Sequence, residues 1–463
     1  MQKNITDFST GSVKKHIVAQ AVPLTLAQAV QLLYNIVDRI YIGHLPDVGQ
    51  VALTGLGITF PVIVLISAFT QLVGVGGTPL FSIARGRKDE KEAEAILGNA
   101  FALLLAAAAG CFVVGYFFRR PILFAFGASE DSYYYADQYL RVYLWGTAFS
   151  MITTGLNGYI NAQGFPKIGM ATTIIGAVIN IILDPIFIFA LDMGVQGAAL
   201  ATVISQGISC AWVLAFLMGK KAILRIRRRT IRISAERSKR IMTLGITGFV
   251  MQGTNSLVSI ACNNQLQIFG ETMMVGGGDL YVGIMTVLNS VRELLSLPVG
   301  GIASGSQPVI GYNYGAGEYK RVKEGIRFMA LLGAGYTLLS WAVVMLVPRV
   351  MISMFTDDAM TIDMGARMLN IYFFGFIFMS LQFAGQCTFQ GLGMAKKAVF
   401  FALFRKVVIV VPLTLLLPRV GFGVEGVFMA EPVSNIVGGM VCFATMWLTV
   451  YKRLDVDGKR SAS

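Results

Sequence analysis

Long stretches without a charged residue dominate this chain. A spanning helix needs about 20 apolar residues, and nine stretches reach that length. They are 16–37, 95–118, 142–166, 193–219, 241–270, 294–317, 328–348, 368–395 and 432–451. Shorter or interrupted stretches around 52–84, 168–190 and 395–417 bring the total to twelve. The pattern therefore predicts twelve transmembrane helices and an all-α polytopic membrane protein.

Short motifs recur in the same order, 227 to 229 residues apart. The pairs are Gln163-Gly164 with Gln390-Gly391, Thr78-Pro79 with Gln307-Pro308, and Gly194-Val195-Gln196-Gly197 with Gly423-Val424-Glu425-Gly426. This period is far too long for a solenoid. It predicts two copies of a six-helix bundle, and paired bundles are common among transporters. We expect parallel repeats related by a pseudo-two-fold axis along the membrane normal.

Composition supports a membrane protein and argues against an enzyme. The chain is 55% hydrophobic and only 14% charged, with a mean hydropathy of +0.66. It has two histidines and no Gly-x-x-x-x-Gly-Lys-Ser/Thr phosphate loop. Its five cysteines lie inside predicted spans without paired spacing, so neither a disulfide framework nor a metal site is indicated. We expect no cofactor.

The distribution of Lys and Arg explains the net charge of +13. With a cytoplasmic N-terminus, most basic residues fall in inside segments. The outside segments carry only Arg119, Arg120, Arg141, Arg349, Arg367 and Arg419. The charge is therefore assigned to topology rather than to nucleic-acid binding, with both termini inside. The predicted regions are a cytoplasmic N-terminus (1–15), an N-lobe (16–219), a basic linker (220–240), a C-lobe (241–451) and a cytoplasmic tail (452–463).

Glycines and prolines interrupt two of the spans. Gly74, Gly76, Gly77 and Pro79 lie in the second, and Pro298, Gly300 and Gly301 lie in the eighth. Small residues let helices approach closely in lipid, while broken helices also act as hinges. Both interpretations are open from the sequence.

Ionisable residues inside predicted spans are costly and need a reason. Asp38 and Asp184 both fall in the outer half of outward-running helices, and Tyr34 and Asn180 precede them by four residues, on the same helix face. Thr202 lies about two turns into the sixth helix. We expect these five side chains to converge in one polar site of the N-lobe.

Removal from water favours the neutral form of a carboxyl group, so this site could carry a proton. The oxygens of Asp38, Asn180, Asp184 and Thr202 could equally hold Na⁺. A purely structural interpretation pairs Asp38 with the adjacent Arg39 and makes Asp184 the cap of a kink at Pro185.

These residues resemble the multidrug and toxic compound extrusion (MATE) family. The similarity rests on the twelve helices, on Asp38, and on the motif Asn180-Ile-Ile-Leu-Asp184-Pro185. The motifs 163–167, 194–199 and 307–315 are similar to those of its DinF- and MepA-like bacterial branch. The resemblance implies a V-shaped pair of lobes and cation-driven export of organic, often cationic, compounds. It also implies that Tyr34, Asp38, Asn180, Asp184 and Thr202 form the N-lobe cation site.

The C-lobe carries other charges within its spans: Arg292, Glu293, Arg405, Lys406 and Glu431. Buried charges need partners, so they form either a structural ion-pair network or a polar wall of the substrate cavity. The second main MATE branch has acidic coupling residues in helices seven and ten, which this sequence lacks.

The sequence therefore predicts a multidrug antiporter coupled to H⁺ or Na⁺ that works by alternating access of its two lobes. We expect small organic substrates, a monomer, and a bacterial cytoplasmic membrane. The alternative is a flippase for a lipid-linked anionic precursor, which would require Arg292, Arg405 and Lys406 to face the cavity without being neutralised by Glu293 and Glu431.

Overall fold

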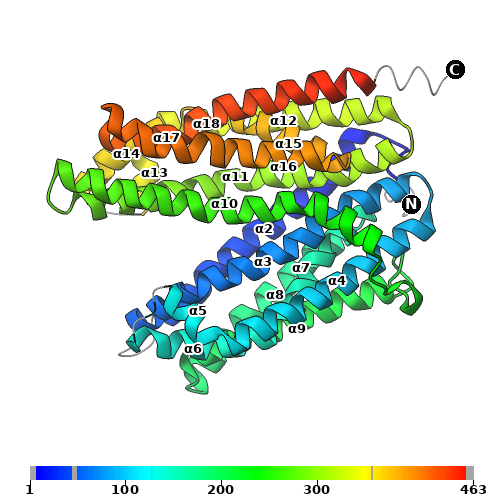
Figure 1. The fold of residues 1–463 in the computed structure, drawn as a ribbon, viewed down its shortest axis with the longest axis horizontal. Helices are drawn as coiled ribbons and strands as arrows, with labels where there is room; N and C mark the ends of the chain where they lie inside the picture. Colours follow the sequence, from blue (N-terminus) through cyan, green and yellow to red (C-terminus); the bar gives the residue numbers. More distant parts are fainter. Residues whose placement is uncertain (1–6, 44–48, 127, 129, 356–357, 455–463) are drawn as a thin grey trace. The chain divides into compact units, whose positions relative to one another are not determined.

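The computed structural model describes residues 7–43, 49–126, 128, 130–355 and 358–454. Within these residues the chain is helical, with short turns and no strand. The predicted all-α fold is confirmed. Figure 1 shows the helices in chain order.

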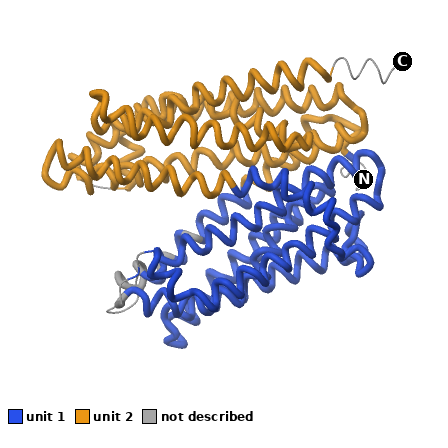
Figure 2. Tube along the Cα trace, viewed as in Figure 1, with its two compact units in different colours: residues 1–7, 26–249 blue, residues 8–25, 250–463 orange. Residues whose placement is uncertain are grey.

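The chain divides into two compact units (Figure 2), and the division falls inside two helices. Unit 1 contains residues 26–249, and unit 2 contains residues 8–25 together with Val250 onward. Helix α2 (Val13–Gly43) is therefore shared at Thr25/Leu26, and α10 (Ala235–Met273) is shared at Phe249/Val250. The predicted lobes begin at residues 16 and 241, so the compact units differ from them at the start of each lobe.

Unit 1 holds the rest of α2 and the helices that follow it. They are α3 (Gly49–Gly86), α4 (Glu90–Phe117), α5 (Arg119–Ala125), α6 (Glu130–Trp145), α7 (Thr147–Ala162), α8 (Pro166–Pro185), η1 (Ile186–Ala190), α9 (Gly194–Met218), η2 (Arg228–Thr230) and the first part of α10.

Unit 2 repeats this order of elements. After α10 come α11 (Gly277–Gly315), α12 (Tyr319–Leu346), α13 (Pro348–Ser353), α14 (Ala359–Phe373), η3 (Phe376–Phe378), α15 (Met379–Gly391), α16 (Ala395–Leu403), η4 (Phe404–Val410), α17 (Val411–Leu416), η5 (Leu417–Val420), α18 (Gly423–Met446) and η6 (Trp447–Tyr451).

In the part of the chain that the structure describes, joining broken helices gives twelve long segments, six in each copy of the repeat, besides the short helices α5, α13 and η2. Among the described residues, nine helices are long and apolar enough to span a membrane. The number is ten if the bent pair of Ala359–Phe373 and Phe376–Gly391 counts as one span. The other two segments are α6–α7 and α10. Both carry many polar side chains, which lowers their hydropathy.

The fourth segment begins earlier than the sequence pattern predicts. The charge-free stretch starts at Val142, whereas α6 begins at Glu130 and includes Asp137 and Arg141. Arg119 forms an ion pair with Asp137 at 2.6 Å, so Asp137 is not an unpaired charge within the helix. The helix therefore includes residues 130–141, a charged stretch that the sequence pattern assigned to a loop.

The repeat is visible in the backbone. Gly194 (φ +51°) and Gly423 (φ +54°) begin α9 and α18 in the left-handed region. That region carries little strain for glycine because it has no Cβ. The duplicated motifs 194–197 and 423–426 thus start equivalent helices with equivalent turns.

Two glycines at equivalent positions of the repeat let the first part of another helix pack closely against them. A Cβ on Gly76 of α3 would overlap the backbone of α10 at Ile241 and Gly245, inside unit 1. A Cβ on Gly305 of α11 would overlap α2 at Ala21, inside unit 2. Close packing therefore accounts for these glycines.

Polar side chains fix the basic linker against unit 1. Gln163 is fully buried and accepts a hydrogen bond from the Leu224 amide at 2.9 Å. Asn99 accepts one from the Ser234 amide at 2.7 Å. Arg227 pairs with Glu94 at 3.2 Å. The duplicated motif that contains Gln163 thus anchors the linker in the first copy.

We expect Gly245→Val to lower the melting temperature, Tm, of the purified protein. Its side chain would meet the carbonyl of Leu72, and such overpacking costs about 1–3 kcal/mol. Gly110→Val is the matched control, because no atom lies within 4 Å of a Cβ there. Equal Tm changes in the two variants would contradict the packing argument.

Candidate functional site

A buried polar cluster lies in unit 1 between α8 and α9. Asp184 is 0% exposed, Asn180 1% and Thr202 3%. The Asn180 amide Nδ2 donates to Asp184 Oδ1 at 3.2 Å and also lies 3.4 Å from Thr202 Oγ1. Three of the five predicted site residues are therefore in direct contact.

Local sequence explains this arrangement. Asn180 and Asp184 are four residues apart on α8, so they lie one turn apart on one face. Pro185 has no amide hydrogen and interrupts the helical ladder, and the π-helix η1 begins immediately after it. π-helical turns often occur at functional sites.

Asp38 and Tyr34 complete the cluster from α2. Both are partly buried. The carboxylates of Asp38 and Asp184 are close enough to interact electrostatically, and the Tyr34 hydroxyl interacts with both. The structure thus brings all five predicted residues together, while their role as a coupling site stays a prediction.

Two tyrosines of α6 belong to the same region, and the sequence analysis missed them. Tyr139 and Tyr143 are buried, and their rings stack at 5.9 Å between centroids. The Tyr139 hydroxyl interacts with Asp38 and with the Thr202 side chain. Their spacing of four residues was an available signal, but the nearby charges had placed Tyr139 in an outer loop, while Tyr143 fell in the predicted span 142–166.

The cluster offers oxygen atoms to a cation. Among the described residues, neither Asn180 Oδ1 nor Asp184 Oδ2 has a hydrogen-bond partner, although both atoms are buried. Buried polar atoms are usually paired. Carboxylate and amide oxygens without partners suit a proton or a hard cation.

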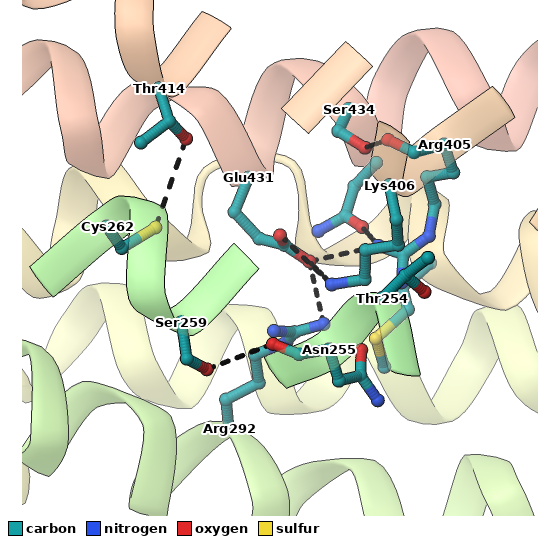
Figure 3. A network of polar contacts seen from close by, with 12 residues as sticks. Thr254, Asn255, Ser259, Cys262, Arg292, Arg405, Lys406, Thr414, Glu431 and Ser434 are labelled. Carbon is teal, nitrogen blue, oxygen red and sulfur yellow. Dashed lines mark hydrogen bonds and ion pairs between the residues drawn. The ribbon is translucent and has the colours of Figure 1, made fainter. Parts of the chain in front are cut away.

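Unit 2 has a different polar centre (Figure 3), where three cationic side chains surround one carboxylate. Arg292 and Arg405 approach Glu431 Oε1 at 2.7 and 2.9 Å. Lys406 lies 3.4 Å from Glu431 Oε2. We call these four residues the C-unit charge cluster.

Neutral side chains extend this cluster. Arg405 also donates to Asn435 Oδ1 at 2.9 Å. Arg292 donates to the Tyr372 hydroxyl at 3.2 Å, and that hydroxyl donates to Asn289 Oδ1 at 2.9 Å. The π-helix η4 carries Arg405 and Lys406, so both cations start from one irregular segment.

Glu293 does not join the cluster. It lies next to Arg292 on α11 but is exposed, and in the described part of the chain Glu431 is the carboxylate within ion-pair distance of the three cations. The predicted C-lobe set is thus brought together except for Glu293, and its role stays a prediction.

The MatE family model matches residues 23–186 and 255–416. The two matches are separated by almost the same offset as the sequence repeat, so each copy matches separately. Together they cover more than half of the chain.

The chain belongs to the MatE family. Members of this family are membrane transporters and not enzymes.

This MatE-family chain is similar to known proteins over nearly its whole length. It is 24% identical over 455 residues to the multidrug export protein MepA of Staphylococcus saprophyticus and of Staphylococcus aureus strain MRSA252, with 97% of each chain covered. It is 25% identical to MepA of Staphylococcus haemolyticus, covering 97% of this chain and 96% of that one. These relatives place it with the DinF/MepA-like branch.

Solved structures confirm the MATE-type fold. One is an outward-facing multidrug resistance MATE transporter of the MOP superfamily, with a TM-score of 0.88. Another is a MOP superfamily transporter from Pyrococcus furiosus described with a binding pocket of reverse polarity, also with a TM-score of 0.88. Each is 24% identical, with 98% of both chains covered.

We expect Glu431→Gln to destabilise unit 2 strongly, because it leaves three cations without their carboxylate. Breaking a buried ion pair costs about 3–5 kcal/mol. The control is Glu425→Gln, since Glu425 pairs with the exposed Arg367 and such pairs contribute about 0–1 kcal/mol. Thermal unfolding in detergent measures both. A Tm for Glu431→Gln no lower than that of the control would refute the stabilising role.

Proposed function

We propose that this chain exports small organic compounds, many of them cationic and amphiphilic, across a bacterial cytoplasmic membrane. Inward movement of H⁺ or Na⁺ drives the export. Support comes from its membership of a transporter family and from relatives named multidrug export proteins that it covers almost completely. We further propose a monomer with both termini in the cytoplasm.

The observation that carries the coupling mechanism is the pair of acids in unit 1. Asp38 and Asp184 interact electrostatically, and Asn180 contacts both Asp184 and Thr202. Two negative charges repel strongly when little water separates them. A proton or sodium ion that binds between them relieves this repulsion, so the site favours one added positive charge.

Cation binding changes what holds α2 to α8. The empty site separates two like charges, whereas the filled site joins Asp38 to Asp184 through a shared ion or a hydrogen bond. Asp38 is on the part of α2 that belongs to unit 1, while residues 13–25 of the same helix belong to unit 2. A shift of α2 at the cation site is therefore passed along one continuous helix to the other unit.

Export follows if substrate and cation favour different arrangements of the two units. Each ligand can shift the equilibrium only by its difference in affinity for the two states. The coupling is reciprocal: the bound cation lowers the affinity for substrate, and the bound substrate lowers the affinity for the cation by the same factor. We propose that this exchange gives alternating access.

The flippase alternative is not favoured. It required three cations that face the cavity together, whereas Arg292, Arg405 and Lys406 all contact Glu431 and Lys406 is only 7% exposed. The relatives described above are also named exporters of drugs.

We expect Asp38→Asn and Asp184→Asn each to abolish export while the protein still reaches the membrane. An amide keeps the size of the side chain but neither titrates nor carries the charge that attracts a cation. The measurement is resistance to a fluorescent organic cation, and its efflux, in a bacterium without its own exporters.

Asp137→Asn provides the matched control. Asp137 is an acid of the same unit, but it pairs with Arg119 away from the cluster, so its variant should export normally. Wild-type export by either site variant, at equal protein amount, would disprove the coupling role.

A further inference from the structure

The C-unit charge cluster contains more positive than negative charge. Two guanidinium groups and one ammonium group contact a single carboxylate, that of Glu431. A guanidinium does not lose its proton in proteins. Even with a neutral Lys406, Arg292 and Arg405 would therefore hold two positive charges against one.

The neighbouring side chains do not remove this excess. Tyr372, Asn435 and Asn289 are neutral hydrogen-bonding groups. Cys262 of α10 lies near Arg292, Lys406 and Glu431 but is a buried thiol. Uncompensated charge within a membrane span is costly, so a further negative charge would stabilise the cluster.

An additional anion can reach the cluster, because its cations are not equally buried. Lys406 is almost fully buried, whereas the side chain of Arg292 is 22% exposed. Figure 3 shows the Arg292 guanidinium between Glu431 and the α10 segment at Asn255 and Ser259. Arg292 is thus the outermost cation of the cluster.

The adjoining face of α10 is polar and exposed. Asn255, Ser259 and Asn263 recur every four residues, and all three are exposed in unit 2. Exposed amides in hydrocarbon would lack partners, so this face suits an aqueous space. An anion could reach Arg292 along it, with the side-chain amides of Asn255 and Asn263 as further donors; the Ser259 hydroxyl already donates to the Asn255 carbonyl oxygen.

We propose that the C-unit charge cluster is a binding site for an oxyanion, a carboxylate or phosphate group held mainly by Arg292. The planar guanidinium fork matches two oxygens of such a group. Glu431 holds the three basic side chains together. The site is separate from the acid pair of unit 1, and binding there does not require transport.

The first test uses the full-length protein in nanodiscs of zwitterionic phosphatidylcholine, with radiolabelled inorganic phosphate as the probe. Ionic strength is held constant with chloride. We expect saturable binding to wild type and at least about tenfold weaker binding to Arg292→Gln, which loses a charge-assisted hydrogen bond.

Two further variants separate loss of the site from loss of folding. Arg292→Lys keeps the charge and should keep more phosphate binding than Arg292→Gln. Arg349→Gln removes an exposed cation of the same unit, paired with Asp363, and should bind phosphate like wild type. Equal loss in Arg349→Gln would overturn the proposal.

A second arm identifies the source of the anion. Nanodiscs that contain phosphatidylglycerol are examined by native mass spectrometry after partial delipidation. Retention of this lipid by wild type, but not by Arg292→Gln, assigns the site to a lipid headgroup. Saturable, Arg292-dependent phosphate binding without lipid retention assigns it to a free anion. If neither probe binds, or if binding is unchanged in Arg292→Gln, the proposal is wrong.

Discussion

The cost of placing an ionisable group inside a membrane span governs both polar centres of this protein. Such a group needs a partner, and the two units supply it in opposite ways. Unit 1 sets two acids, Asp38 and Asp184, beside an amide and a hydroxyl. Unit 2 surrounds one acid with three cations, a site that lacks negative charge. We propose that unit 1 takes a cation at its acids and that unit 2 takes an anion at its cations.

Duplication explains the shared helix arrangement of the two units but not their different polar centres. Gly76 and Gly305 each admit the first part of another helix, and Gly194 and Gly423 begin equivalent helices with the same backbone. The paired acids occur in the first copy only. Gln265 falls near the position of Asp38, and Val411 opposite Asp184. We infer that the copies share a scaffold and divide the functions, with the coupling ion in unit 1.

How much could be predicted depended on whether the signal was local. Asn180 and Asp184 share a helix face, and counting along two outward-running helices put Asp38 and Asp184 at one depth, so the cluster was foreseeable. Tyr139 was missed because Asp137 and Arg141 resemble loop charges until their helix and the ion pair with Arg119 are seen. Tyr143 fell in a predicted span, but its relation to Tyr139 depends on that same helix. The division of α2 and α10 between the two units has no local sequence signal, because it follows from contacts between residues far apart in sequence. Glu293 carries no signal that separates it from its neighbour Arg292.

The central claim is that cation flow through the acid pair of unit 1 drives export. The most direct measurement is efflux of a fluorescent organic cation from vesicles that contain the purified protein, with pH and sodium gradients imposed separately. The account predicts flux that follows at least one gradient in wild type and neither gradient in Asp38→Asn. Wild-type flux independent of both gradients would contradict it.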